Sequence, residues 1–375
     1  MRLDRVRNLA LDFVQATPAT CWAFLTLTTE AGLSGLGEAT LPGEEARLAA
    51  GFPELERRAL ALSGADPASL AAEAPLAGLA GAALHCALDQ ALWDVAARRA
   101  GVPLATALGG ARRTAVPLYA NVNRRTRERS PASFARSAAT AAAAGFRAVK
   151  IAPFDEVDEP ARARGEARAA AAPGLNRIAA VRAAIGPEIE LMVDCHWRFD
   201  AAAAAAVLAE CAALGVVWFE CPLPETPETI PTISALRALA HRHGLRLAGG
   251  EKLVRLAAFA PFIDAGAYDV MMPDIKYSGG LTEMLRLAER MAVAGIAFSP
   301  HNPSGPVAHA ASLQLSAAAP ILDRLELQWD ESPLFAALPR PPLPAPRDGF
   351  APVPLDRPGI GITLDRAFAT RADRA

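Results

Sequence analysis

The pattern of apolar residues divides the chain into an N-terminal part and a longer, repeating part. Residues 24–29 have strand character, residues 30–32 carry turn residues, and residues 33–38 return as a second strand, so the pattern predicts a hairpin. Over residues 44–100 the apolar spacing becomes helical. We therefore expect a small α+β unit in the first third, with two to four helices behind an antiparallel sheet.

Beyond Pro117, short β-rich runs alternate with helical runs rich in Ala, Leu and Arg. Such alternation is typical of successive βα units with a parallel sheet. Eight units favour a (β/α)8-type barrel over an open, doubly wound sheet. The predicted strands span residues 117–121, 148–151, 188–194, 216–220, 245–248, 269–274, 296–299 and 322–327.

Two segments depart from this repeat. Residues 153–173 form an extra, charge-rich stretch, which we interpret as an insertion over the mouth of the barrel. Residues 338–346 are dense in proline, which excludes regular structure and predicts a surface crossover towards the N-terminal sheet. The expected architecture is an α+β capping domain over residues 1–113, a modified (β/α)8 TIM-type barrel over 114–338, and a segment over 339–375 that completes the cap.

Composition and charge exclude several classes of protein. Hydrophobic residues make up 52% of the chain and charged residues 21%, which is incompatible with general disorder. Lys and Arg number 38 against 40 Asp and Glu, so no strongly basic surface for nucleic acid is expected. No apolar run reaches the roughly 20 residues of a membrane span, and no signal-peptide core is recognisable. We expect a cytoplasmic protein without nucleic-acid or membrane partners.

Five scattered cysteines without a Cys-x-x-Cys pair predict reduced, packed thiols. The sequence also lacks a Gly-x-Gly-x-x-Gly fingerprint, a Walker loop and a Gly-x-Ser-x-Gly elbow. Dinucleotide, phosphate-loop and serine-hydrolase chemistry are therefore not indicated.

Ionisable residues follow the predicted strands at seven successive positions. Because the carboxyl ends of the strands in a parallel barrel share one face, we expect these side chains to surround a single site. They are Lys150, Asp194, Glu220, Glu251, Asp274, His301 and Glu326.

Three of them, Asp194, Glu220 and Glu251, are carboxylates on neighbouring strands. Carboxylates that face one point repel each other unless a cation neutralises them. Oxygen-only ligands suit a hard ion, so Mg²⁺ is the first expectation and Mn²⁺ the second. Each residue alone could be a solvated acid or a helix cap, but the consecutive trio favours a metal site.

Asp274 and His301 end the sixth and seventh strands and are expected to be neighbours. A carboxylate beside an imidazole fixes its tautomer and raises its basicity, which suits a general base; a buried, capped histidine is the alternative. His196 lies two residues after Asp194, so its side chain points the same way if that stretch is extended. It could then be a second acid–base group or a hydrogen-bond donor, or merely a loop histidine.

The remaining polar residues at the strand ends are less specific. Lys150 could hold an anionic group of the substrate or pair with an acid of the site. Glu326 could contact the substrate or form a structural ion pair. Asn121 and Asn123, after the first strand, are candidate polar contacts to a substrate.

Together these features resemble the enolase superfamily, and within it the mandelate racemase-like branch. Residues 35–38 and 358–361 are similar to the capping domain of that family. Six ordered motifs in the barrel carry the rest of the resemblance, so that it covers nearly the whole chain. The motifs span residues 145–150, 191–196, 218–222, 248–252, 272–280 and 299–306.

The resemblance implies roles for individual residues. The three carboxylates would bind one Mg²⁺, and His301, paired with Asp274, would remove the proton next to a substrate carboxylate. Asp-x-His after the third strand and Ser-Pro-His-Asn-Pro resemble acid-sugar dehydratases of the galactonate type. In those, the histidine matching His196 protonates the departing β-hydroxyl, and the residue matching Glu326 hydrogen-bonds the substrate carboxylate or enediolate.

One departure from the family pattern bears on the reaction. Many members carry Lys-x-Lys at the end of the second strand, and the second lysine is a base, whereas Lys150 is followed here by Ile151 and Ala152. The loss counts against a racemase, which needs acid–base groups on both faces of the α-carbon. It leaves a division of labour between His301 and His196 that fits elimination.

The sequence therefore predicts a Mg²⁺-dependent hydro-lyase. The enzyme would abstract the α-proton of an acid sugar and eliminate the β-hydroxyl, giving a 2-keto-3-deoxy acid. A racemase or epimerase of a 2-hydroxy acid, with His196 or Lys150 as the opposing base, is the alternative on the same site. A metal-dependent hydrolase would need histidine ligands, and a barrel that only binds a sugar acid remains open. The family implies a homo-oligomer.

Overall fold

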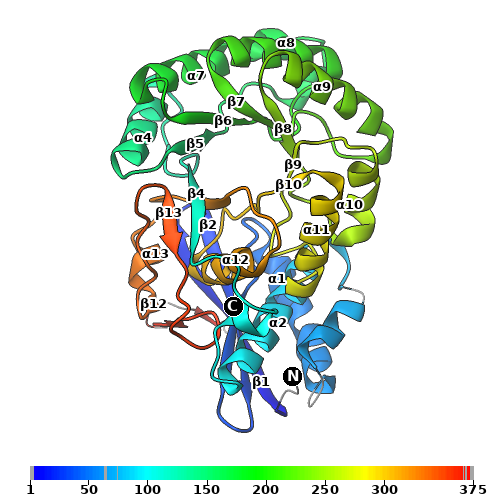
Figure 1. Ribbon diagram of the computed structural model, residues 1–375, viewed down its shortest axis with the longest axis vertical. Helices are drawn as coiled ribbons and strands as arrows, with labels where there is room; N and C mark the ends of the chain where they lie inside the picture. Colours follow the sequence, from blue (N-terminus) through cyan, green and yellow to red (C-terminus); the bar gives the residue numbers. More distant parts are fainter. Residues whose placement is uncertain (1–3, 63–65, 74, 366, 368–369, 372–375) are drawn as a thin grey trace.

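The fold combines a ring of parallel strands with an α+β part packed at one side of it (Figure 1). The computed structural model describes residues 4–62, 66–73, 75–365, 367 and 370–371. None of the described helices is long and apolar enough to cross a membrane. All five cysteines are free, as predicted, and four of them are buried.

The N-terminal part is an antiparallel sheet with two long helices. Its strands lie in the order β15–β1–β2–β3, which agrees with the predicted hairpin and adds a long first strand that the sequence did not reveal. A register shift between Val6 and Asn8 interrupts the alternation of that strand, and this hides its period. The elements are β1 (Val6–Thr17), β2 (Thr20–Thr29), β3 (Ser34–Glu38), α1 (Glu45–Ala61), η1 (Pro67–Ala72), α2 (Gly78–Arg99), α3 (Leu104–Ala107) and β15 (Thr370–Arg371).

All eight predicted barrel strands are present and parallel. β4 to β10 pair in chain order, and the last strand, β11, returns to pair with β4. Backbone hydrogen bonds from Asp323 to Phe298 (2.8 Å) and from Glu326 to Pro300 (3.3 Å) link β11 to β10 and complete the ring. The strands are β4 (Ala115–Asn121), β5 (Ala148–Ile151), β6 (Glu190–Asp194), β7 (Val216–Glu220), β8 (Arg246–Gly249), β9 (Val270–Met271), β10 (Ala297–Phe298) and β11 (Leu325–Gln328).

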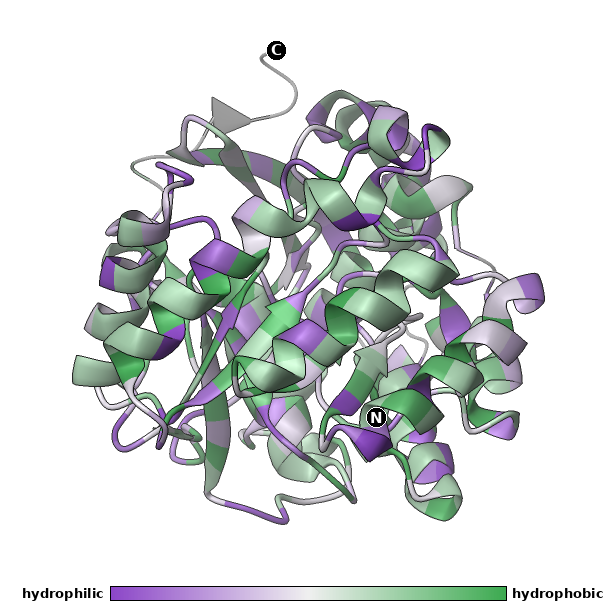
Figure 2. Cartoon of the chain, turned by 90° about the horizontal axis from the view of Figure 1, so that it is seen from above, coloured by the Kyte–Doolittle hydropathy of each residue, from purple (hydrophilic) through white to green (hydrophobic). Residues whose placement is uncertain are grey.

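Helices surround the strands, as the outer arc of Figure 1 shows. Local signals set their starts: Ser130 and Asp200 each accept a backbone N–H of the first turn that follows. Figure 2 shows pale green over much of the helical surface, since many of these positions are alanine. The helices are α4 (Pro131–Ala143), α7 (Ala172–Ile185), α8 (Ala201–Ala213), η2 (Pro227–Thr229), α9 (Ile230–Arg242), α10 (Arg255–Asp264), α11 (Leu281–Ala294), α12 (Pro306–Ala318) and α13 (Leu334–Ala337).

The expected insertion, residues 153–173, contains α5 (Glu159–Ala163) and α6 (Ala167–Ala170) and runs into α7. The segment lies beside the loop that follows β6, because Arg162 donates to the carbonyl of Trp197 (3.4 Å). Arg198 of that loop donates to the carbonyl of Asp155 (2.9 Å) in return. The segment therefore contacts the loop that carries His196, and its place over the mouth of the barrel stays a prediction.

The proline-dense stretch, residues 338–346, was predicted to have no regular structure, and this is wrong at β12 (Pro339–Arg340), a short strand that pairs with a distant segment. Residues 341–346 have none, and β13 (Phe350–Pro352) follows. β13 pairs with β4 of the barrel, and β12 pairs with β14 (Thr363–Leu364). β15 then joins β1. The C-terminal segment therefore contacts both the barrel and the N-terminal sheet.

Buried acids of the N-terminal part hold the starts of two barrel helices. Glu38, at the end of β3, accepts the backbone N–H groups of Gly305 (2.6 Å) and Ala308 (2.8 Å) at the start of α12. Asp89 of α2 accepts the N–H of Leu281 (2.6 Å) at the start of α11. Gly280 allows that approach, because its φ is 96° and a Cβ there would lie 2.6 Å from the carboxyl carbon of Asp89.

Candidate active site

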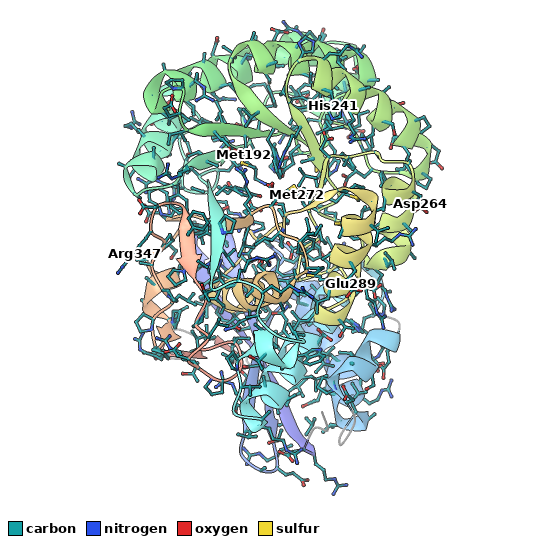
Figure 3. The ribbon with its side chains drawn as sticks, in the orientation of Figure 1. Met192, His241, Asp264, Met272, Glu289 and Arg347 are labelled. Carbon is teal, nitrogen blue, oxygen red and sulfur yellow. The ribbon has the colours of Figure 1, made fainter. Side chains whose placement is uncertain are left out.

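An apolar layer inside the ring supports the predicted site. Tyr119, Met192, Trp218 and Met272 belong to one buried cluster within the barrel, and Figure 3 shows Met192 and Met272 inside the ring of strands. Side chains two residues apart on a strand point to the same side. Asp194 and Glu220 therefore stand directly above Met192 and Trp218, on a base that excludes water.

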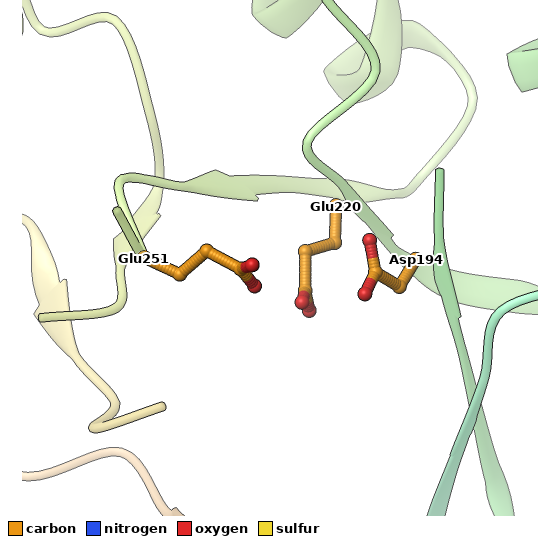
Figure 4. A group of neighbouring side chains, drawn as sticks. All are labelled: Asp194, Glu220 and Glu251. Atoms are coloured by element: carbon orange, nitrogen blue, oxygen red, sulfur yellow. The ribbon is translucent and has the colours of Figure 1, made fainter. Parts of the chain in front are cut away.

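The structure brings the three predicted metal ligands together. Asp194 ends β6, Glu220 ends β7, and Glu251 follows β8 in a turn. One oxygen atom from each carboxylate lies within 4.8 Å of the others, and all three residues are buried (Figure 4). The predicted convergence of these three residues is therefore confirmed.

Lys150 pairs with acids of the site, which is one of the two alternatives that its sequence position left open. Its Nζ lies 2.6 Å from Oε1 of Glu220 and 3.2 Å from Oε1 of Glu326. The second oxygen of Glu220 accepts the indole N–H of Trp218 at 2.7 Å. Burial nevertheless raises the pKa of Glu220 well above its usual range, with Asp194 and Glu251 adding to the effect against Lys150.

Glu251 carries a charge that the chain compensates only in part. Burial, followed by the charge of Asp194, raises its pKa to about 8. Its Oε2 is among the buried polar atoms of the described residues that have no hydrogen-bond partner. A buried carboxylate oxygen without a donor is costly, and an all-oxygen donor set suits a hard divalent cation. The residues present therefore fit such an ion, held by Asp194, Glu220 and Glu251.

The predicted general base, His301, and its carboxylate partner, Asp274, also lie together. His301 Nδ1 lies 2.7 Å from Oδ2 of Asp274, and the two residues form an isolated parallel bridge beyond β9 and β10. The other ring nitrogen, Nε2, lies 3.2 Å from Oε2 of Glu251 and 3.8 Å from Oε2 of Glu326. The carboxylate of Asp274 thus orients the imidazole so that Nε2 faces the acidic cluster.

Lys276 is a third member of this group, and it was not predicted from the sequence. Its Nζ donates to the same Oδ2 of Asp274 (2.7 Å) and to Oγ of Ser304 (2.5 Å). Burial alone would raise the pKa of Asp274, but the charge of Lys276 and the hydrogen bond from His301 lower it to about 2. Lys276 lies in the turn that follows Asp274, where its own backbone N–H donates to Oδ1 of Asp274 (2.7 Å), and the strand pattern gives no signal for such a position.

His196 reaches the site by a different backbone path from the predicted one. The stretch after Asp194 is not extended: His196 and Trp197 have φ angles of 48° and 56°. The left-handed turn lets the His196 N–H donate to Oδ1 of Asp194 (2.9 Å) while Nε2 contacts Oδ2 (2.8 Å). The charge of Asp194 raises the pKa of His196 against the opposing effect of burial. Such conformations are costly and cluster at functional sites.

The two predicted asparagines, Asn121 and Asn123, have different hydrogen-bond partners. Asn121 donates to Oε1 of Glu326 (2.5 Å), whose other oxygen accepts the backbone N–H of Asn302 (3.0 Å). Glu326 and Asn121 therefore belong to the cluster, and Asn302 is a further member that the sequence did not suggest. Asn123 instead accepts from Arg129 (2.8 Å), a contact that holds the loop after β4 and does not join the acidic cluster.

Glu225 is a further, partly buried acid that the strand ends did not reveal, because it lies in the loop after β7. Its Oε1 accepts the N–H of Gly250 (2.5 Å) and the hydroxyl of Tyr268 (2.9 Å). Its Oε2 accepts the indole N–H of Trp197 (3.1 Å). Glu225 thereby joins the turn before Glu251 to the left-handed turn that presents His196.

Comparison with known proteins agrees with this arrangement. The family model described as "Mandelate racemase / muconate lactonizing enzyme, N-terminal domain" matches residues 8–109. The model described as "Enolase C-terminal domain-like" matches residues 133–368, which is more than half of the chain.

Individual relatives are similar over different lengths. A D-gluconate dehydratase of Thermoproteus tenax is 34% identical over 247 residues, covering 66% of this chain and 48% of the relative. A D-galactonate dehydratase of Verminephrobacter eiseniae (strain EF01-2) is 30% identical over 303 residues, covering 78% of this chain and 75% of the relative. The chain thus spans about half the length of the first relative and three quarters of the second.

A solved structure described as a mandelate racemase/muconate lactonizing enzyme from Jannaschia sp. CCS1 has the same fold. Its TM-score is 0.84 at 26% identity, with 99% of this chain and 97% of that chain covered. With both family models matched in order along the sequence, the chain belongs to the enolase superfamily, in its mandelate racemase / muconate lactonizing enzyme group.

Proposed function

We propose that this chain is a Mg²⁺-dependent acid-sugar dehydratase that converts a polyhydroxy carboxylate into a 2-keto-3-deoxy acid. The observation that carries the proposal is the orientation of His301. Its Nδ1 is bound to Asp274, and its Nε2 faces the three carboxylates. A base held beside a cation-binding trio suits removal of a proton next to a carboxylate. The relatives named as dehydratases of gluconate and galactonate support the same substrate class.

The first step is transfer of the α-proton of the substrate to Nε2 of His301. Asp274 stabilises the imidazolium that forms, because its carboxylate already accepts the Nδ1 proton. A divalent cation held by Asp194, Glu220 and Glu251 would supply positive charge to the carboxylate oxygens as the enediolate develops. Glu326, which lies 3.8 Å from Nε2 of His301, faces the same region.

The second step is loss of the β-hydroxyl. His196 donates a proton to the departing oxygen, so that the C–O bond breaks with release of water and an enol is left. The enol then tautomerises to the 2-keto-3-deoxy acid. His196 suits this role because it contacts Asp194 while its side chain stays 39% exposed towards the mouth of the site. Lys150, fully buried between Glu220 and Glu326, orients these two acids.

Racemisation or epimerisation of a 2-hydroxy acid is the second candidate on the same site. It requires an opposing base, and the structure offers His196 as the accessible group. Lys150 suits that task less, since its ammonium is enclosed by two carboxylates. We prefer elimination because the relatives named above are dehydratases of gluconate and galactonate.

Proton NMR in D₂O distinguishes the two reactions. The protein would be incubated with Mg²⁺ and pooled aldonic and aldaric acids, with an EDTA sample as the control. Loss of the α-proton signal together with new deoxy-methylene resonances is expected for dehydration. Deuterium exchange with retained substrate would favour racemisation, and the absence of both would contradict the proposal.

The proposal extends to the location, the oligomeric state and the domain organisation of the enzyme. We propose a cytoplasmic homo-oligomer with a small carboxylate as its only substrate partner. We also propose that residues 1–113 and 339–375 act together as the cap over the barrel of residues 114–338. Light scattering of the purified protein tests the oligomeric state.

A further inference from the structure

The turn that presents His196 has a backbone that needs support. His196 and Trp197 have φ angles of 48° and 56°, and Cys221 in the neighbouring loop after β7 has one of 44°. Such left-handed angles are costly for residues other than glycine and persist only where the surroundings impose them. The backbone supplies one contact, from the N–H of Trp197 to the carbonyl of Cys221 (2.6 Å). The side chain of Trp197 supplies the others.

A hydrogen bond fixes the edge of the indole. Nε1 of Trp197 donates to Oε2 of Glu225 (3.1 Å). The other oxygen of Glu225 accepts the N–H of Gly250 (2.5 Å) and the hydroxyl of Tyr268 (2.9 Å). Gly249 leaves room for this carboxylate, because a Cβ there would lie 2.4 Å from Oε1 of Glu225. Glu225 is thus held by two further donors and offers the indole a fixed acceptor.

Two side chains adjoin the indole ring itself. Nζ of Lys252 lies 4.1 Å from the centre of the Trp197 ring, within the range of a cation–π interaction. The imidazole of His196 is stacked with the same indole, with 6.4 Å between ring centres and 27° between the ring planes. Trp197, Glu225 and Lys252 follow β6, β7 and β8 respectively. The indole therefore connects the three loops that also carry the proposed cation ligands.

The use of lysine in this chain draws further attention to Lys252. The chain contains only three lysines, against 35 arginines. Lys150 and Lys276 are buried in ion pairs with acids of the site. Lys252 is exposed, and it contacts the site through the ring of Trp197. All three lysines thus lie beside the candidate active site, at the carboxyl ends of the strands.

We propose that Trp197, held by Glu225 and Lys252, is a positioning residue for His196. The proposal rests on the function proposed above, in which His196 donates a proton to the departing hydroxyl. With its edge fixed by a carboxylate and its ring by an ammonium, the indole keeps the turn in its left-handed conformation and the imidazole in one orientation. Removal of the α-proton by His301 does not depend on the indole, since Asp274 orients that base.

The two steps can be followed separately in D₂O with Mg²⁺. Proton NMR measures deuterium in the recovered substrate, which reports α-proton removal, and the deoxy product, which reports elimination. We expect Trp197→Phe and Glu225→Gln to lower product formation by about tenfold to a hundredfold, as for a slightly misplaced group. The ratio of deuterium exchange to product should rise by a similar factor. A purely structural role would lower both rates together and leave that ratio unchanged.

The variants of Lys252 refine the test. Lys252→Met should raise the ratio less than Trp197→Phe, because the indole keeps its hydrogen bond. Lys252→Arg should restore the wild-type ratio, since a guanidinium also binds the face of an aromatic ring. Trp93→Phe is the matched control: it removes an indole from α2 whose N–H has no hydrogen-bond partner among the described residues. It should leave the ratio unchanged.

An unchanged ratio in Trp197→Phe and Glu225→Gln would overturn the proposal. Failure of the proposed function is a separate result, because the wild-type protein itself would then form no deoxy product. In that case protein labelled with ¹⁵N-histidine decides, with the imidazole signal of His196 assigned by its loss in His196→Asn. Glu225→Gln and Lys252→Met leave both rings in place, so a shifted His196 signal is expected. An unmoved signal in both variants would overturn the positioning role.

Discussion

The two halves of the site differ in how their buried charge is compensated. On one side, Asp274 accepts both His301 and Lys276 at 2.7 Å, and its pKa falls to about 2. On the other side, Glu251 has a buried oxygen without a hydrogen-bond partner, and its pKa rises to about 8. The groups that compensate Asp274 are all part of the chain, whereas Glu251 keeps an oxygen that would be free to bind an added cation.

The difference assigns separate tasks to the two halves. A base must have a fixed tautomer and orientation before the substrate arrives, and the protein itself provides both. A cation site instead brings its acids close together, so that all of them attract the bound ion and the ion relieves their repulsion. Variants in each half should therefore fail in different ways.

The largest effect is expected for His301→Asn, which removes the only imidazole paired with Asp274. Turnover should fall by about a thousandfold or more, since a positioned general base contributes 10²–10⁴-fold. Cation binding, followed by Mn²⁺ titration in an electron paramagnetic resonance tube, should persist. Turnover close to wild type would refute the assignment of His301 as the base.

Glu251→Gln is the counterpart on the other side. It should abolish tight cation binding in the same titration, because one of three ligands loses its charge. Turnover would then be lost through the ion, and a high Mg²⁺ concentration should recover part of it. Undiminished Mn²⁺ affinity in this variant would mean that the trio is not the cation site.

Lys276→Met is expected to have an intermediate effect. The variant leaves Asp274 buried with one partner fewer, and breaking a buried ion pair costs about 3–5 kcal/mol in stability. We expect turnover to fall by about tenfold to a hundredfold, mainly in kcat, because the imidazole loses its fixed orientation. Urea unfolding and steady-state kinetics measure the two effects.

Arg286→Met is the control for that experiment, since Arg286 is an exposed residue of α11 whose acidic neighbour is Glu283. It should change neither quantity measurably. A kcat for Lys276→Met that equals the wild-type value would show that Asp274 orients His301 without the lysine.

Part of the fold and of the candidate site could be predicted from the sequence. Residues that a single strand end positions were predictable, whereas those that depend on contacts between distant segments were not. The eight strands and the residues at their ends were predictable, because the βα repeat fixes which side chains share a face. Asp194, Glu220 and Glu251 follow from that rule, and so do Asp274 and His301. The geometry of one strand end is enough to place each of them.

The features that the sequence did not reveal depend on contacts between distant loops or on special backbone angles. Glu225 accepts hydrogen bonds from Gly250 and Trp197, which lie in two other loops, so no strand-end pattern points to it. His196 reaches Asp194 through a left-handed turn that alternation cannot predict.

The pH dependence of stability offers a smaller but sharper test of the uncompensated side. Without a cation, the pKa of Glu251 is about 8, above its ordinary value of 4.5. Between these pH values the folded state binds more protons than the unfolded state, so stability decreases as pH rises. The Mg²⁺-dependent increase in Tm should therefore be larger at pH 8 than at pH 6. An increase that is equal at both values would contradict the assignment of uncompensated charge to Glu251.

The smallest expected effect is a difference in stability between variants of two buried glutamates, Glu38 and Glu251. Burial raises the pKa of both, but they differ in their hydrogen-bond partners. Burial raises the pKa of Glu38 too, but its oxygens accept Gly305, Ala308 and the hydroxyl of Thr40. Glu38→Gln turns an amide towards one of these donors and should cost about 1–3 kcal/mol. Glu251→Gln in EDTA removes an unpartnered acid and should leave stability equal or higher. Urea unfolding measures the free energy of unfolding of both variants. Equal losses of stability would contradict this distinction, because Glu251 would then be compensated as fully as Glu38.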